Sequence, residues 1–319
     1  MTKTLVNIPI IDFEPFLSGD AEARQAVARQ IYHACHEIGF MYLNPGIPAT
    51  LIDNLFAQTK LFFELPFDVK NQLAWVDKFS NRGYVGVERE RLNPDNPGDL
   101  KEAFNVGKEV IPDQISTQDK SSLIINQWPV GEDKFRQTVL EFYQACAEAA
   151  DKICQAFAIA LELPESFFAD KHEEQNYTLR LLHYPPLEQA VKPGQVRAGE
   201  HSDYGSFTLL FQDEVGGLEV RTADGEWIAA PYIPGTVVVN TGDLMQQWTN
   251  HEFCSTKHRV MVPSDDRVKR SRYSVAFFCH PNNDAEIACI ESCQGENRPP
   301  LYPPISAGDY LLSRLQATY

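Results

Sequence analysis

The chain has 319 residues, a mass of 36.1 kDa and a formal net charge of -16 at pH 7. A surface this acidic repels nucleic acid and anionic membranes, so we expect neither as a partner, although a local basic pocket can still hold a small anionic molecule. No apolar run reaches the length of a membrane-spanning helix, and we expect no signal peptide because the first residues lack a long apolar stretch.

The chain contains seven cysteines, an odd number, scattered along its length. Several lie within apolar or helical segments, a setting typical of buried free thiols in a reducing compartment. Cys289 and Cys293 are close in sequence, but no second pair completes a zinc-binding pattern. We therefore expect a cytoplasmic protein, and no feature of the sequence indicates an obligate protein partner.

The N-terminal third is predicted to be helical around a short strand. Residues 21–40 place apolar side chains three and four positions apart, which predicts an amphipathic helix, and a second helix is predicted at residues 49–66. Between them, residues 39–48 form a predicted strand that ends in a Pro-Gly turn. Residues 81–99 are rich in turn-forming side chains and are predicted as a loop. A long helix is predicted from about residue 132 to residue 161.

Short runs of β-branched and aromatic residues, separated by turns with Pro and Gly, follow Tyr177. We predict strands in the stretches YTLRLLHY, SFTLLFQ, GLEVR, TVVVN, HRVMV and RYSVAFF. Several strands at short spacing predict an antiparallel sandwich or barrel, and AGDYLLSRLQATY predicts a closing helix. The chain is therefore predicted to form a single α+β unit, with an N-terminal region at residues 1–115, a long-helix region at 116–175, a β core at 176–285 and a C-terminal segment at 286–319.

A histidine and a carboxylate stand two residues apart in GEHSDYGSFTLLFQDEVGG, at the start of a predicted core strand. Alternation along a strand would place His201 and Asp203 on one face. An isolated pair of this kind is common and often forms only a turn beside a satisfied histidine. Here His258 begins another predicted strand, and two imidazoles with one carboxylate are the facial triad of non-haem iron(II) enzymes. Zinc held by the same ligands would instead activate water.

Arg272 and Ser274 lie two residues apart on the predicted strand RYSVAFF. A guanidinium on a sheet face needs an anionic partner, and a carboxylate bound through both oxygens suits its geometry. The pair can hold the distal carboxylate of a dicarboxylate such as 2-oxoglutarate, whose other end would chelate iron. The alternative is a surface arginine with a serine neighbour, which the adjoining VAFFC makes a poorer fit.

Taken in order, these motifs resemble the iron(II)/2-oxoglutarate-dependent oxygenases of the isopenicillin N synthase-like group. The resemblance covers nearly the whole chain, from IPIIDFEPFL and HEIGFMYLNPGIP to EHSDYGSFTLLFQDEVGGLEV, NTGDLMQQWTNHEFCSTKHRV and RYSVAFFCHPN. It implies a double-stranded β-helix (a cupin-like jelly roll) with flanking N-terminal helices and a C-terminal helix. It also implies iron(II), 2-oxoglutarate and dioxygen, with His201, Asp203 and His258 as the iron ligands.

The resemblance further implies that Arg272, Ser274 and Tyr184 bind 2-oxoglutarate. Many plant members carry an asparagine two residues before that tyrosine, but this chain has Leu182 there. One cosubstrate contact is therefore missing or is supplied elsewhere. The implied reaction is oxidation, in the default case hydroxylation, of a small organic molecule with release of succinate and carbon dioxide.

Within this group, LRLLHYP, PGQVRAGEHSDYGS and RYSVAFFCHPN are most similar to thymine 7-hydroxylase-like members. The residues that line the substrate pocket there match Arg180, Tyr204 and Phe278. Two aromatic rings and a guanidinium can stack against and hydrogen-bond a flat heterocycle such as a nucleobase. The alternative is that these residues are shared throughout the branch and carry no information on the substrate.

Three other interpretations fit the same motifs. The site can catalyse ring closure, desaturation or another oxidation without 2-oxoglutarate, as isopenicillin N synthase does. The chain can also be a zinc hydrolase on a cupin-like barrel, or a non-catalytic binding module of that fold. An absorption band formed with iron(II) and 2-oxoglutarate, and succinate formed under air, would separate the leading interpretation from all three.

Other polar residues in the β region are assigned structural roles. His183 faces away from the neighbouring tyrosine if the strand alternates regularly. His251 lies in a polar turn and His280 precedes a proline, so all three histidines are predicted to be structural or exposed. Gly242 and Asp243 are predicted to form a turn between strands.

Overall fold

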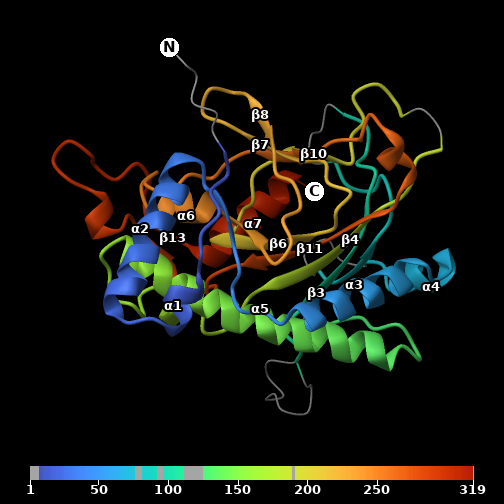
Figure 1. Cartoon of the computed structure of the whole chain (residues 1–319), viewed down its shortest axis with the longest axis horizontal. Coiled ribbons are helices and arrows are strands. Elements are labelled where there is room, and N and C mark those ends of the chain that lie inside the picture. The colour runs from blue at the N-terminus through green and yellow to red at the C-terminus, as the bar shows by residue number, and fades with distance from the viewer. Residues whose placement is uncertain (1–6, 76–80, 92–95, 111–124, 189–190, 319) are drawn as a thin grey trace.

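The computed structural model of the chain describes residues 7–75, 81–91, 96–110, 125–188 and 191–318. Its β core consists of two antiparallel sheets, and Figure 1 shows them as two layers with helices below. The larger sheet contains, in spatial order, β1 (Phe40–Leu43), β9 (Val237–Thr241), β6 (Phe207–Gln212), β11 (Arg272–Cys279), β4 (Thr178–Tyr184), β3 (Glu102–Gly107) and β2 (Gly83–Val85).

The smaller sheet lies over one face of the larger sheet. Side chains from both sheets line one cavity between them, as in a jelly roll. This arrangement confirms the predicted double-stranded β-helix. The strands of the smaller sheet are, in spatial order, β5 (Ala198–His201), β10 (His258–Val260), β7 (Leu218–Arg221) and β8 (Trp227–Ala229), and a separate pair contains β12 (Glu286–Ile287) and β13 (Ile305–Ser306).

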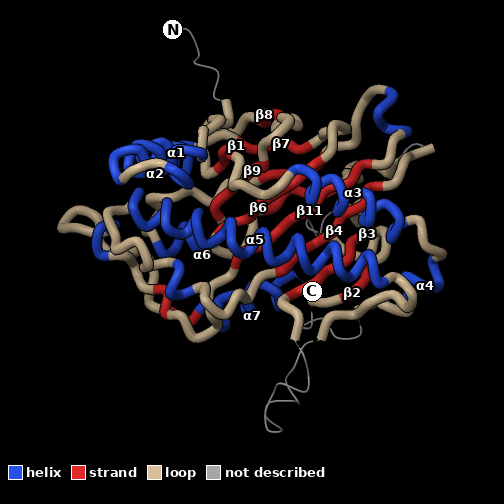
Figure 2. Tube along the Cα trace, turned by 60° about the horizontal axis from the view of Figure 1, so that its bottom comes forward, coloured by secondary structure: helices blue, strands red, loops and turns tan. Residues whose placement is uncertain are grey.

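Helices cover the other face of the larger sheet. Figure 2 shows α3 and α5 lying across β11, β4 and β3. These helices occur where the sequence predicts them, because each presents an apolar stripe of roughly helical period to the sheet. The helices are α1 (Glu14–Ser18), α2 (Ala21–Glu37), α3 (Ala49–Phe63), α4 (Phe67–Asn71), α5 (Asp133–Ala160), α6 (Asp243–Trp248) and α7 (Ala307–Thr318), with short 3-10 turns at Ala169–Lys171, Asp266–Lys269 and Glu291–Cys293.

The strand β11 separates the packed core from the functional face. Phe277 is fully buried and contacts Tyr143 of α5 edge to face. Side chains on a strand alternate between its faces, so Arg272, Ser274 and Phe278 point the other way and line the cavity between the sheets. The almost continuous apolar run of β11 therefore contributes side chains both to the packed core and to the cavity between the sheets.

Two predictions about turns are wrong. Residues 81–99 are not all loop, because β2 pairs with β3 and extends the sheet at its edge. Gly242 and Asp243 do not form a turn between strands. Gly242 is extended and accepts a hydrogen bond through its carbonyl from the amide of Gln246, and Asp243 begins α6, where a carboxylate is favoured by the helix dipole.

The cysteines and helices agree with the expectations from composition. All seven cysteines are free thiols, so Cys289 and Cys293 form no disulfide. In the part of the chain that the structure describes, no helix is both long enough and apolar enough to cross a membrane. The cytoplasmic location and the boundaries of the four predicted regions stay predictions.

Candidate metal and cosubstrate site

Three side chains with metal-binding atoms converge between the two sheets. His201 ends β5 and His258 begins β10, and the two residues are direct partners in this antiparallel pair. Their Nε2 atoms lie 3.9 Å and 3.6 Å from Oδ1 of Asp203, respectively. Among the described residues, these three form the only cluster of His, Cys, Asp or Glu whose ligand atoms all lie within 4.8 Å of one another.

Asp203 reaches this cluster by a different route from the one predicted. The strand β5 ends at His201, so Asp203 lies in the connection to β6 and not on the same strand. The backbone amide of Asp243 donates to the Asp203 carbonyl over 2.7 Å and fixes this connection. A Cβ on Gly242 would lie 2.9 Å from the same carbonyl oxygen, so the close approach requires glycine.

Hydrogen bonds to the backbone determine which imidazole nitrogen faces the cluster. His201 Nδ1 lies 2.8 Å from the Gly199 carbonyl, and His258 Nδ1 lies 3.1 Å from the Thr256 carbonyl. A carbonyl only accepts, so each Nδ1 carries the proton and donates it. In the neutral form of each ring, Nε2 is then left with a free lone pair, which is the form that binds a metal ion.

The Asp203 carboxylate is held from the larger sheet. Its Oδ2 accepts hydrogen bonds from Thr208 Oγ1 over 2.6 Å and from Asn240 Nδ2 over 2.8 Å. Both donors belong to neighbouring strands, where Thr208 and Asn240 are register partners. Because Oδ2 is occupied, Oδ1 is the oxygen presented to the two histidines.

The charge states of the triad suit a cation. Burial and the neighbouring His258 lower the pKa of His201 to about 3, so His201 is neutral at physiological pH. Although burial is the largest influence and opposes ionisation of Asp203, His258, His201 and Asn240 together outweigh it and hold the pKa of Asp203 well below its usual value. Burial also opposes the charged form of His258, but Asp203 prevails and raises the pKa of His258. A bound metal ion can replace the proton on His258 as the positively charged partner of the Asp203 carboxylate.

Arg272 is a buried cation without an ionic partner in the described residues. Its side chain is 1% exposed; Nη1 donates to Ser274 Oγ over 3.1 Å and Nη2 to Gln212 Oε1 over 3.2 Å. The guanidinium carbon lies 4.7 Å from the centre of the Tyr184 ring, and Nε has no hydrogen-bond partner. A buried guanidinium with an unsatisfied donor fits a carboxylate ligand.

A second buried guanidinium was not identified from the sequence. Arg197 is 0% exposed, and only Nη2 has a partner, the Arg270 carbonyl at 3.2 Å. Burial, and then the charge of Arg272, lower the pKa of Arg197. Asp213 lies near both guanidiniums, and burial raises its pKa, but a single carboxylate cannot balance two cations. Excess positive charge at this end of the cavity again favours an anion.

Leu182 has a defined place in this wall. It is the register partner of Ser274 and lies, largely buried, in the cavity lining. On the other side of Ser274, Gln212 is the partner and supplies the amide that contacts Arg272. The position that is often asparagine in plant members is therefore an apolar contact here.

The predicted substrate residues lie at the other end of the same cavity, which has a volume of about 180 Å³. Arg180 is the register partner of Ala276, Phe278 lies further along β11, and Tyr204 follows Asp203 directly. The structure brings all three together, and adds lining residues that the sequence did not place in a cavity, among them Asn81, Glu90, Lys101, Thr208, Asn240, His280 and Leu311.

The three histidines that were predicted to be structural or exposed lie in different surroundings. His183 contacts Glu102 Oε1 at 2.7 Å and stacks on Tyr273, away from the cavity, as predicted. His251 stacks on Tyr302 and has the predicted structural role. His280 lines the cavity, and burial lowers its pKa to about 4, so its structural role stays a prediction.

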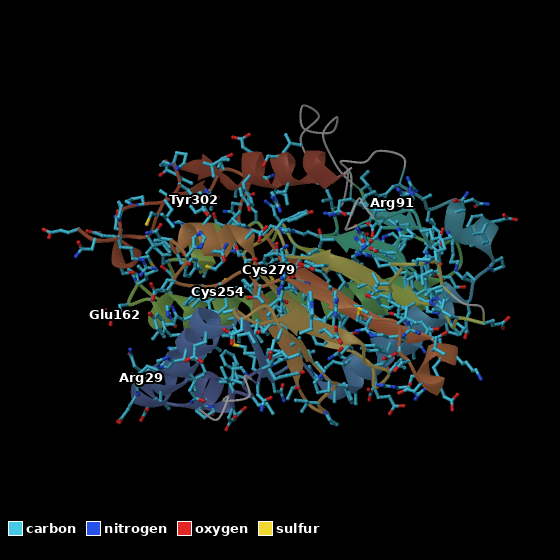
Figure 3. The ribbon with its side chains drawn as sticks, turned by 90° about the horizontal axis from the view of Figure 1, so that it is seen from above. Arg29, Arg91, Glu162, Cys254, Cys279 and Tyr302 are labelled. Atoms are coloured by element: carbon cyan, nitrogen blue, oxygen red, sulfur yellow. The ribbon has the colours of Figure 1, made fainter. Side chains whose placement is uncertain are left out.

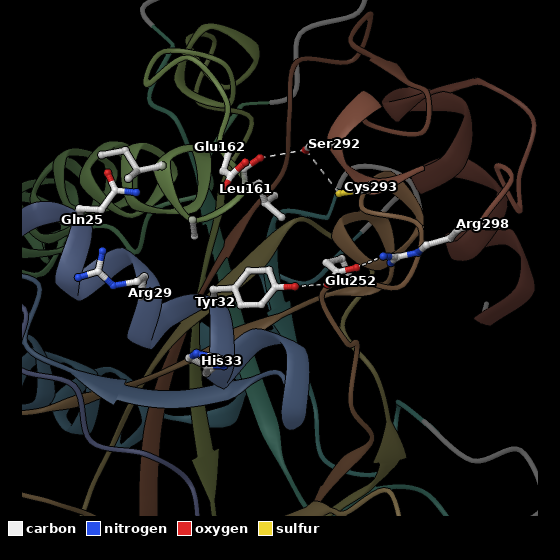
Figure 4. A pocket seen from close by; sticks show the side chains of 12 residues that line it. Gln25, Arg29, Tyr32, His33, Leu161, Glu162, Glu252, Ser292, Cys293 and Arg298 are labelled. Carbon is white, nitrogen blue, oxygen red and sulfur yellow. Dashed lines mark hydrogen bonds and ion pairs between the residues drawn. The ribbon is translucent and has the colours of Figure 1, made fainter. Parts of the chain in front are cut away.

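A larger cavity of about 550 Å³ lies away from the triad, between α2, the end of α5 and residues 291–298. Figure 4 shows that Tyr32 and Arg298 both contact the Glu252 carboxylate there. In Figure 3, Arg29 and Glu162 of this cavity lie at the periphery of the molecule. Since its central carboxylate is already paired, this cavity offers no comparable ligand site.

Comparison with known proteins identifies the family. Residues 8–131 match the model described as "non-haem dioxygenase in morphine synthesis N-terminal", and residues 175–281 match the "2OG-Fe(II) oxygenase superfamily". The 2-oxoglutarate-Fe(II) type oxidoreductase hxnY of Emericella nidulans is 34% identical over 98% of this chain and 90% of its own length. The chain belongs to the 2OG-Fe(II) oxygenase superfamily.

Solved structures and other relatives agree with this assignment. The thymine 7-hydroxylase of Neurospora crassa, solved with alpha-KG and thymine, has a TM-score of 0.89 and 35% identity, covering 100% of this chain and 99% of the other. Validamycin A dioxygenase of Streptomyces hygroscopicus subsp. limoneus is 30% identical over 97% of this chain and 86% of its own length. The chain is therefore an enzyme, a dioxygenase that uses iron(II), 2-oxoglutarate and dioxygen, and the relatives favour none of the three other interpretations.

Proposed function

We propose that iron(II) is held by Nε2 of His201, Nε2 of His258 and Oδ1 of Asp203. The proposal is supported by hydrogen bonds that engage Nδ1 of each histidine and Oδ2 of Asp203. One nitrogen of each histidine and one oxygen of the carboxylate are therefore left for the metal. When bound, iron(II), 2-oxoglutarate and dioxygen supply the oxidant that inserts oxygen into a C–H bond of the substrate, with release of succinate and carbon dioxide.

We propose that Arg272 and Ser274 bind the distal carboxylate of 2-oxoglutarate, with Tyr184 at its side. The support is the unpaired buried guanidinium, together with the hydroxyl that already lies 3.1 Å from it. Leu182 and the ring of Tyr184 keep this end apolar and exclude water, which strengthens the ion pair. Arg197 is buried near Arg272 and adds to the positive potential there.

For the substrate, we propose a small, uncharged, flat heterocycle, with a pyrimidine nucleobase as the first candidate. One observation carries this proposal. Arg180, Tyr204 and Phe278 line a cavity of about 180 Å³ next to the triad, in a chain 35% identical throughout its length to a relative solved with thymine. The aromatic rings offer stacking surfaces, the guanidinium offers donors for ring carbonyls, and hydroxylation is the expected outcome.

Turnover of a substrate panel tests this proposal. The enzyme, loaded with iron(II) and 2-oxoglutarate under air, is given thymine, uracil, a free amino acid or a phenol, and succinate and oxidised product are both measured. We expect succinate formation to be stoichiometric with product only for thymine-like bases. Stoichiometric turnover of the amino acid or the phenol, with none for the bases, would exclude the nucleobase proposal and leave the oxygenase assignment unchanged.

A further inference from the structure

A buried cluster of alternating charges forms the wall of the cavity at the Arg180 end. Glu90 is ion-paired with Arg180, and its Oε2 lies 3.6 Å from Lys101 Nζ. Lys101 Nζ in turn lies 2.7 Å from Asp99 Oδ2. The side chains of this charge cluster (Asp99, Lys101, Glu90 and Arg180) are only 3% to 13% exposed. Three of them, all except Asp99, line the cavity.

Backbone contacts hold the charge cluster in place. The Asp99 amide donates to the Glu90 carbonyl over 2.9 Å, so the two acidic residues are fixed to each other. Asp99 Oδ1 also accepts a hydrogen bond of 3.0 Å from the amide of Gly199, two residues before His201. The position of Glu90 is therefore tied to the same strand that carries a metal-binding histidine.

The two ends of the cavity differ in charge balance. The formal charges of the charge cluster cancel, since Asp99 and Glu90 offset Lys101 and Arg180. At the opposite end, Arg272 has no ion pair among the residues that the structure describes, and its Nε is unsatisfied. A carboxylate entering at Arg272 gains a partner. A carboxylate entering at Arg180 meets a cation that is already neutralised and a second carboxylate close by, which is unfavourable in a buried site.

We propose that Glu90 is the residue that makes the substrate end of the cavity accept uncharged polar ligands and reject carboxylates. It does so by placing a carboxylate against Arg180 and Lys101, so that neither cation is left unbalanced within the charge cluster. The same charge directs the dicarboxylate cosubstrate to Arg272 and away from Arg180. This inference rests on the proposed function only in taking the Arg180 end as the substrate end.

Exchanging Glu90 for glutamine tests the role of its charge. Glu90→Gln keeps the length of the side chain and an oxygen that accepts from Arg180, but leaves the cavity wall with one excess positive charge. Binding is measured by calorimetry on the enzyme loaded with iron(II) and 2-oxoglutarate without oxygen, using two pairs of probes: uracil with uracil-6-carboxylate, and benzamide with benzoate. We expect the preference for the neutral member of at least one pair to fall by about tenfold or more, as for a removed like charge.

Two variants serve as controls. Glu88→Gln removes the same charge from the same segment, but Glu88 pairs with Lys192 outside the cavity, so the preference should stay within about twofold. Glu90→Asp retains the charge and should retain the rejection of carboxylates. The absorption band formed with iron(II) and 2-oxoglutarate, together with the thermal midpoint, reports whether each variant is folded and loaded.

The possible results separate this inference from the proposed function. An unchanged preference for both pairs in a folded, loaded Glu90→Gln variant would overturn the role of Glu90, whether or not thymine is a substrate. A shifted preference supports it even if the thymine assay fails. A second readout is inhibition by excess 2-oxoglutarate, which should appear in Glu90→Gln at concentrations that leave Glu88→Gln unaffected.

Discussion

Asn240 donates a hydrogen bond of 2.8 Å to Oδ2 of Asp203, and so links the larger sheet to a residue in the connection that leaves the smaller one. Thr208 donates to the same oxygen. The orientation of the carboxylate is therefore determined by two residues that donate hydrogen bonds to Oδ2, the oxygen turned away from the histidines. Partners of this kind commonly contribute 10- to 100-fold to metal affinity.

Asn240→Ala should weaken iron(II) binding by about 10- to 100-fold, because Oδ2 loses one of its donors and the carboxylate can rotate. Anaerobic titration with iron(II), followed by calorimetry, measures the change without any turnover. Asn176→Ala is the matched control, since that amide contacts only an exposed glutamate side chain in the described residues. Equal affinity in Asn240→Ala and the unaltered enzyme would contradict the positioning role.

Arg272→Leu should raise the dissociation constant of 2-oxoglutarate by about 10²- to 10³-fold, as for a buried carboxylate that loses its charged partner. Iron(II) binding should be retained, because the triad lies mainly on the smaller sheet. Arg272→Lys keeps the positive charge but lacks the planar guanidinium, so its dissociation constant for 2-oxoglutarate should lie between those of the unaltered enzyme and Arg272→Leu. Arg270→Leu, which removes an exposed arginine two residues earlier, should bind 2-oxoglutarate normally; a comparable loss there would show that the effect is not local.

The helix α7 contacts the substrate end of the cavity through Arg314. Its guanidinium carbon lies 4.8 Å from the centre of the Tyr204 ring, and Nη2 lies 3.2 Å from Asp243 Oδ2. Arg314→Ala should therefore raise KM for the organic substrate about 2- to 30-fold, the range of a cation–π contact, with the affinity for 2-oxoglutarate unchanged. Ser313→Ala on the same helix is the control. A change in 2-oxoglutarate affinity instead would indicate a general loss of structure.

Glu102 should be the main buried carboxylate that stabilises the fold on the helix side of the sheet. Its Oε2 accepts hydrogen bonds of 2.8 Å from Lys70 Nζ and 2.5 Å from the Tyr84 hydroxyl. Burial raises the pKa of Glu102, but hydrogen bonds from His183, Lys70 and Tyr84 outweigh it, so the net shift is downward. A lowered pKa in the folded state means that the stabilisation is complete above the ordinary value of about 4.3 and is lost as pH falls through the lowered value.

Glu102→Gln should lower the free energy of unfolding at pH 7 by about 3–5 kcal/mol, because Lys70 stays buried without a charged partner. The difference from the unaltered protein should shrink once the pH falls below about 4. Urea unfolding at both pH values measures it. Glu64→Gln breaks only the exposed pair with Lys60 and should cost about 0.5 kcal/mol or less. A pH-independent difference would mean that shape, not charge, explains the loss.

Local spacing was sufficient to select residues that the fold brings together. Arg272 and Ser274 stand two residues apart on β11, and the alternation of that strand places both on the cavity face. His201 and Asp203 also stand two residues apart, but only His201 lies on a strand. The helices and most strands follow from hydrophobic period in the same way. The placement of Asp203 off the strand was missed because a hydrogen bond from the distant Asp243 fixes it.

The residues that could not be predicted owe their position to pairing between distant segments. Asn240 meets Asp203 because β9 pairs with β6, and Lys101 borders β3, which reaches the cavity by pairing with β4. Glu90 and Arg197 resembled ordinary charged residues of loops, since burial is invisible in a single sequence. The proposed role of Glu90 depends on nearby cations, and that of Arg197 on the lack of an ion pair among the described residues. Only the fold determines which charges lie close together.

The cavity draws its parts from separate stretches of the chain. The two histidines proposed to hold iron belong to the smaller sheet, whereas Glu90, Lys101 and Asn81 come from the N-terminal segments beside β2 and β3. Substitutions in those segments can alter which molecules enter without disturbing the atoms that carry the oxidation. The oxidising centre can therefore be inherited unchanged while substrate preference diverges, and chimeras that exchange only the N-terminal third between relatives should shift in substrate preference toward the donor, with Arg180, Tyr204 and Phe278 still supplied by the recipient.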